Sequence, residues 1–144
     1  MKSLKSATSL VMIGIALLAN TIPQSARAQT ELQDAMDQMQ DAYRTVGRAL
    51  RKPEENLAKL LDAAQAMQEG AIKSKALEVE IPPGIPNEQI NQYQLQFRIL
   101  MNESLLALVQ FEQALLKEDF DAAKKAFAAV RASKADGHDA FEVN

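Results

Sequence analysis

The chain of 144 residues contains no cysteine and a single histidine, His138. Without cysteine there are no disulfide bonds, cysteine-ligated zinc or iron–sulfur clusters, cysteine nucleophiles or covalent Cys-x-x-Cys-His haem attachment. One histidine cannot supply the two Glu-x-x-His motifs of a carboxylate-bridged di-iron enzyme. Hydrolase triad spacings, a Gly-rich phosphate loop and an HExxH motif are also missing. The sequence therefore predicts a protein that is not an enzyme and whose fold is stabilised by packing, alone or with a cofactor.

The chain also lacks an apolar run of the roughly 20 residues that a membrane-spanning helix needs. Its longest apolar run, 10–18, follows Lys2 and Lys5 and precedes the small-residue pattern Ala26-Arg27-Ala28. This order is typical of a secretory signal peptide cleaved after Ala28, and a retained membrane anchor is the alternative. We therefore expect a signal peptide over 1–28, export to the periplasm, and one domain over 29–144 without membrane attachment.

Basic clusters are missing from that expected mature domain. Cleavage removes three basic residues and no acidic ones, so the formal net charge changes from −3 to −6. An acidic domain of this kind is not expected to bind nucleic acid. It is compatible with a partner that carries a basic surface patch.

Apolar residues recur at helical spacing throughout the mature chain, and no strand pattern competes with them. The expected helices run over about 31–51, 53–75, 87–117 and 120–142, with a proline-rich loop before the third. Short first and third connections require antiparallel neighbours. The predicted fold class is thus all-α, an antiparallel up-down-up-down four-helix bundle.

Three polar residues are expected to cap helices at their N-termini, namely Thr30, Asn87 and Asp119. Gly70 is expected to weaken the second helix, which should fray over 73–75. In the third helix, Leu95 and Leu106 widen the main apolar stripe. That helix is therefore expected to be the most buried of the four.

His138 shares one helical face with Phe127, Val130, Lys134 and Phe141. In the predicted bundle the start of the first helix and the end of the fourth meet. Met36 and His138 then both lie on core-facing stripes, roughly 6–8 Å below that end. A methionine and a histidine that face each other are a known pair of axial ligands to haem iron. A core-filling methionine and a half-buried histidine are the alternatives.

The same neighbourhood is expected to contain a second methionine, Met39, together with Phe97 and Met101 from the third helix. Lys134 either pairs with a haem propionate or extends along the surface towards water. Asp136 and Asp139 flank the histidine, as solvated charges or as hydrogen-bond acceptors that orient the imidazole.

At this point the sequence resembles the soluble periplasmic cytochrome b562 family. The likeness rests on ELQDAM, on FRILMNESLLALVQFEQALL with the turn KEDFD, and on KKAFAAVRASKADGHDAF. The family is a known up-down-up-down bundle. The resemblance implies that Met36 and His138 are axial ligands, that Phe97 is a pocket aromatic and that Met39 is an apolar pocket residue.

The chain departs from the family pattern at three positions near the expected haem. Lys134 stands where an arginine is expected, Met101 replaces a second pocket aromatic, and Glu142 takes the place of a basic residue. Gly137, directly before the expected ligand, weakens the helix by about 1 kcal/mol relative to alanine. These departures affect the expected haem affinity and redox potential more than the fold.

The resemblance implies a periplasmic electron-transfer protein that binds one non-covalent haem b through Met/His ligation. Its partner would be an unidentified periplasmic redox protein, and the chain would be a monomer or weak dimer. The alternative is a haem-free periplasmic helical bundle that acts as a binding or stress-related scaffold. The same apolar stripes would then form an ordinary core.

Overall fold

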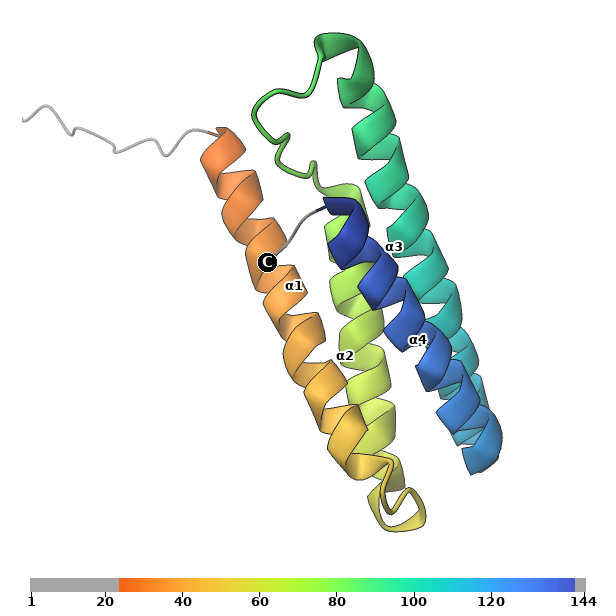
Figure 1. Ribbon diagram of the computed structural model, residues 1–144. Coiled ribbons are helices and arrows are strands. Elements are labelled where there is room, and N and C mark those ends of the chain that lie inside the picture. Colours follow the sequence, from red (N-terminus) through yellow and green to blue (C-terminus); the bar gives the residue numbers. More distant parts are fainter. Residues whose placement is uncertain (1–23, 142–144) are drawn as a thin grey trace, which may run out of the picture.

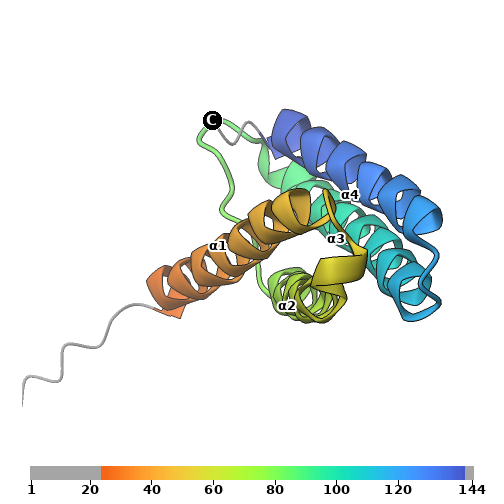
Figure 2. The same ribbon diagram turned by 90° about the horizontal axis from the view of Figure 1, so that it is seen from below.

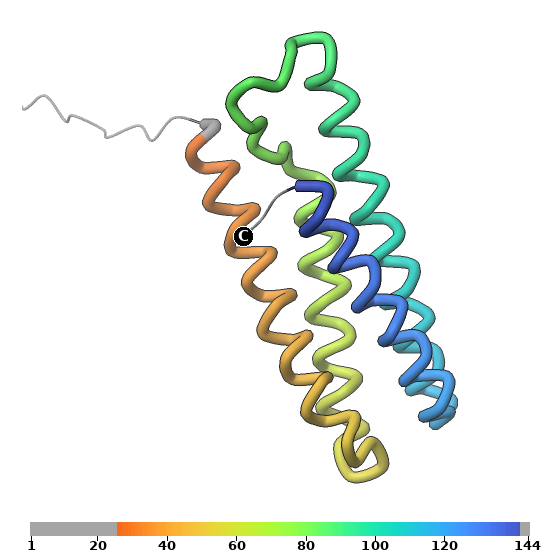
Figure 3. Tube along the Cα trace, viewed as in Figure 1, coloured from red at the N-terminus to blue at the C-terminus, as the bar shows by residue number. Residues whose placement is uncertain are grey.

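The computed structural model describes residues 24–141 and forms an antiparallel bundle of helices (Figure 1). Most of the expected signal peptide, residues 1–23, and Glu142 lie outside the described residues. The elements are α1 (Gln24–Ala49), the short 3-10 helix η1 (Glu54–Asn56), α2 (Leu57–Ala76), α3 (Asn87–Leu116) and α4 (Phe120–Phe141). The chain trace rises and falls in alternating directions (Figure 3), which confirms the predicted four-helix bundle. None of the described helices is both long and apolar enough to cross a membrane.

The helices pack mainly against their neighbours in sequence, α1 on α2, α2 on α3 and α3 on α4. The view along the bundle shows α1 and α4 as separate rods (Figure 2). Aromatic rings link them at one level, since the rings of Tyr43 and Phe127 lie 5.0 Å apart. Phe127 in turn lies 5.5 Å from the ring of Phe111 on α3.

The continuous core fills the half of the bundle that contains the two short connections. Its fully buried members come from all four helices and include Val46, Leu60, Met67, Leu108, Phe111, Leu115 and Ala123. Phe97, Leu100 and Met101 are also buried, but they lie outside this continuous cluster. The opposite half of the bundle is therefore packed differently, and it is there that the chain forms a cavity.

The structure corrects the expected start of the first helix. α1 already begins at Gln24, and Thr30 lies inside it, where its Oγ1 donates to the carbonyl of Ala26 at 3.0 Å. Residues 26–29 are good helix formers, and Arg27 pairs with Glu31 at 3.0 Å, so the helix continues without a cap at Thr30. The predicted cap at Thr30 is wrong.

Of the other two predicted caps, one is confirmed. Asp119 Oδ1 accepts a hydrogen bond from the backbone N–H of Ala122 at 3.0 Å. Asn87 is instead the first residue of α3, and Pro86 occupies the N-cap position with no side-chain cap. The second helix continues through Gly70 and ends at Ala76, one residue beyond the segment 73–75 where fraying is expected.

The outer face of α3 is exposed, contrary to the expectation from its sequence. Leu95 is 57% exposed and Leu106 is 61% exposed. α3 packs against α2 and α4, and those two contacts cover only the stripe that contains Phe97, Met101 and Phe111. No described helix packs against the other side of α3, so the flanking leucines are exposed to water.

The α2–α3 loop, residues 77–86, is fixed to α3 by one glutamine. Gln94 Nε2 donates to the carbonyl of Val79 at 2.7 Å, and Gln94 Oε1 accepts from the N–H of Val79 at 3.0 Å. One side-chain amide thus replaces both partners that Val79 would have in a strand. Gln94 thus holds the loop beside the half of the bundle that contains the cavity.

Replacing Gln94 by alanine should release this loop without unfolding the bundle. Both hydrogen bonds of the Val79 backbone are lost, whereas the core residues are unchanged. We expect the amide of Val79 to exchange with deuterium at least about tenfold faster, which corresponds to the loss of about 1.4 kcal/mol of local protection. Unchanged exchange at Val79 would contradict this role, and the α3 amides near Phe111 serve as the internal control.

Candidate functional site

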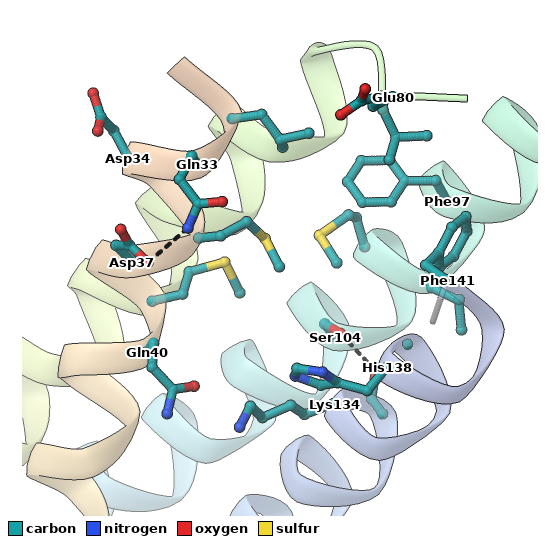
Figure 4. A pocket seen from close by; sticks show the side chains of 18 of the residues that line it. Gln33, Asp34, Asp37, Gln40, Glu80, Phe97, Ser104, Lys134, His138 and Phe141 are labelled. Atoms are coloured by element: carbon teal, nitrogen blue, oxygen red, sulfur yellow. Dashed lines mark hydrogen bonds between the residues drawn. The ribbon is translucent and has the colours of Figure 1, made fainter. Parts of the chain in front are cut away.

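A cavity of about 1000 Å³ lies in the open half of the bundle. It is bounded mainly by α1, α3, α4 and the α2–α3 loop, α2 contributes Met67, and Figure 4 looks into it. The six residues that the sequence predicts as site residues all line this cavity: Met36, Met39, Phe97, Met101, Lys134 and His138. The fold thus brings together side chains that are up to 102 positions apart in the sequence.

The α1 wall presents thioethers to the cavity. Met36 and Met39 are both half-buried. The Sδ atom of Met36 accepts a hydrogen bond from Ser74 Oγ on α2 at 3.6 Å. Sulfur atoms gather in the middle of the space seen in Figure 4, and all sulfur in this chain belongs to methionine.

The opposite wall is formed by the end of α4. His138 is exposed to solvent, and its imidazole extends from α4 into the space between the helices (Figure 4). Lys134, one turn earlier, is half-buried, and its Nζ lies 5.0 Å from the centre of the Tyr43 ring on α1. This cation–π contact spans the cavity from α4 to α1.

The register of α1 and α4 differs from the level match that the sequence predicts. Tyr43 faces Phe127, so Met36, seven residues earlier, is level with Lys134, seven residues later. His138 lies four residues further along α4, which places it about 6 Å nearer the end of the bundle where α1 begins and α4 ends. Helical side chains lean towards the N-terminus of their own helix. In antiparallel helices Met36 and His138 therefore lean towards each other, which reduces the offset.

An aromatic cluster closes one side of the cavity. The ring of Phe141 meets Phe97 edge-on at 5.6 Å and Tyr93 edge-on at 4.8 Å. The sequence places Phe141 on the same stripe as His138, but Phe141 and Tyr93 were not predicted as site residues. Their spacing of three and four from His138 and Phe97 was the signal that could have identified them.

The loop contributes a further wall that sequence reasoning did not predict. Val79, Glu80, Pro82 and Pro83 line the cavity together with residues of α1 and α3. The hydrogen bonds from Gln94 to Val79 hold this wall in place. Because the loop lies more than ten residues from every predicted ligand in sequence, helical periodicity carries no information about it.

The neighbours of His138 in sequence are two carboxylates, Asp136 and Asp139, and a glycine, Gly137. Asp136 and Asp139 are exposed and do not line the cavity, as expected of solvated helix charges. Gly137 lines the cavity, and a Cβ atom at this position would meet nothing within 4 Å. Among residues 24–141 there is no group of three or more His, Cys, Asp or Glu that could hold a metal ion. The metal donors at issue are therefore the thioethers and the imidazole.

Comparison with models of protein families, with curated proteins and with solved structures gave no significant match for this chain. The functional interpretation therefore rests on the residues and on the geometry of the cavity.

Proposed function

We propose that this protein binds one non-covalent b-type haem in the cavity and transfers electrons. One observation carries the proposal. A large, mainly apolar cavity has a methionine sulfur on one wall and the only imidazole of the chain on the facing wall. Thioether and imidazole together are a known axial pair for haem iron.

The volume and the mainly apolar lining of the cavity suit a large apolar cofactor such as haem. The volume of about 1000 Å³ lies at the upper end of the range for small-molecule and cofactor sites. Phe97 and Met101 are buried beside it, and Phe141 adds a second ring. Met36 and His138 would hold the iron, with Met39 and Met101 as apolar contacts.

When bound, the haem iron supplies one-electron exchange, and a thioether ligand favours the ferrous state. Met36 and His138 would fill both axial positions, which leaves no open position for a substrate. This supports electron transfer rather than catalysis. Lys134 provides a positive charge at the cavity wall. Its ammonium group would leave the Tyr43 ring and pair with a haem propionate instead.

Haem titration of the purified protein tests the proposal. We expect saturation at one haem per chain and the sharp absorption bands of six-coordinate, low-spin haem in the ferrous state. The absence of these bands at stoichiometric haem would exclude the proposal. Because no cysteine is present, extraction with acidified organic solvent should remove all of the haem.

We further propose that the protein acts in the periplasm, with a redox partner that carries a basic surface. The support is the signal-like segment over 1–28 and the net charge of −6 that remains after cleavage. A haem-free scaffold is the second candidate. It is favoured by the contacts that Met36 and Lys134 already make with Ser74 and Tyr43. A colourless protein after purification from its own cells and after haem titration would support it.

A further inference from the structure

Ser74 on α2 is a fully buried hydroxyl that does not line the cavity. Its side chain is 0% exposed, and it is one of two buried polar residues among those described, together with Ser104. The hydroxyl of Ser104 pairs with that of Ser133 on α4. Ser74 Oγ instead donates to the sulfur of Met36 on α1, at 3.6 Å. The buried hydroxyl of α2 is thus directed at the proposed methionine ligand.

This choice of acceptor differs from that of the two threonine hydroxyls on α1. Thr30 and Thr45 on α1 donate to the carbonyls four residues earlier, Ala26 and Asp41, at 3.0 Å each. That bond within the helix is the usual one for a serine or threonine in a helix. Ser74 bonds across the α1–α2 interface to a thioether, a weaker acceptor than a carbonyl. The contact therefore follows from how α1 and α2 pack.

We propose that Ser74 is a positioning residue, which orients the sulfur of Met36 and tunes the redox potential of the bound haem; this inference rests on the proposed function. A thioether sulfur has two lone pairs. One accepts the hydrogen bond from Ser74, which leaves the other for coordination of a metal. Ser74 does not line the cavity, so it would act on a bound haem only through Met36.

The sign of the effect follows from the electron density on sulfur. A hydrogen bond to sulfur draws density away from it and weakens its donation to ferric iron more than to ferrous iron. Ser74 thus stabilises the ferrous state and raises the potential. Removing the hydroxyl should lower the potential. Mutation of a residue that hydrogen-bonds to a metal ligand typically changes metal affinity or activity by about 10–100-fold. Sulfur is a weak hydrogen-bond acceptor, so we expect a change of at most about tenfold in the redox equilibrium here.

The experiment measures the midpoint potential of haem-loaded parent, Ser74→Ala and Ser74→Cys. The thiol of cysteine is close to serine in size and is a weaker donor. We expect the potential to fall in the order Ser, Cys, Ala. The full decrease should reach at most about 59 mV, which corresponds to tenfold for one electron. The ferric iron–sulfur charge-transfer band should shift in the same order and remain visible, because Met36 still binds.

Thr45→Ala is the matched control, because it removes a helical hydroxyl that bonds to a backbone carbonyl and does not line the cavity. Its potential should equal that of the parent. Two results would overturn the inference alone: haem-loaded Ser74→Ala at the parent potential, or an equal shift in Thr45→Ala. Failure of the parent to form low-spin haem would overturn the proposed function and this inference with it.

Discussion

Replacing His138 by alanine should abolish the low-spin haem spectrum and lower haem affinity by at least about 100-fold. Changing mere partners of metal ligands already costs about 10–100-fold, and loss of the only imidazole in the chain costs more. The fold should be unaffected, since His138 is exposed and a helix accepts alanine readily. Haem titration followed by absorption measures the affinity, and circular dichroism measures the helix content.

Asp139→Ala is the matched control for this experiment. Asp139 adjoins His138 on α4, is exposed and does not line the cavity, so its replacement should leave haem binding unchanged. A His138→Ala protein that binds haem as tightly as the parent, with the same bands, would exclude His138 as a ligand. Equal losses in both variants would indicate damage to α4 rather than loss of a ligand.

Replacing Gly70 by alanine should destabilise the bundle by up to about 2 kcal/mol. A Cβ atom at Gly70 would overlap Cγ of Met39 and lie 3.0 Å from the carbonyl oxygen of Ala35. Met39 can change rotamer, but the Ala35 carbonyl belongs to the α1 backbone, so α1 must move away. Overpacking of this kind costs about 1–3 kcal/mol, and the gain of about 1 kcal/mol from alanine in a helix offsets part of it, which leaves a net loss of up to about 2 kcal/mol.

Gly47→Ala is the control of opposite sign. Gly47 lies on α1, is exposed, and a Cβ atom there meets nothing within 4 Å. The variant should gain up to about 1 kcal/mol. Urea denaturation of both proteins, compared at equal slope, measures the two changes. If Gly70→Ala is as stable as Gly47→Ala, then α1 and α2 do not approach as closely as the structure shows.

Helical periodicity was sufficient to predict the four helices and their antiparallel order. It failed where the outcome depended on neighbours in space. Leu95 and Leu106 are apolar and correctly spaced, but α3 has no helix packed against that side. Gly70 was interpreted as a weak point of α2, whereas it permits the close approach of α1. The low helix propensity of glycine can be read from a sequence, but the space that it leaves for a neighbour cannot.

The candidate site was predictable in composition and less so in geometry. Met36 and His138 were placed at one end of the bundle because the first and last helices meet there. Their offset of one turn was missed, since the level match relied on a helix start near Glu31 rather than at Gln24. The contact from Ser74 to Met36 could not be predicted, because it depends on the register between α1 and α2.

The separation of α1 from α4 has a consequence for the order of folding. The extensive helix contacts are all between helices that follow one another in the chain. Such contacts form fast, because closing a short connection costs little conformational entropy. The approach of Tyr43 to Phe127 instead requires closure of 83 intervening residues, so it should come last. The three helix pairs can therefore assemble before the cavity exists. In this protein we therefore expect the ligand-sized space to be the final product of folding rather than the template for it.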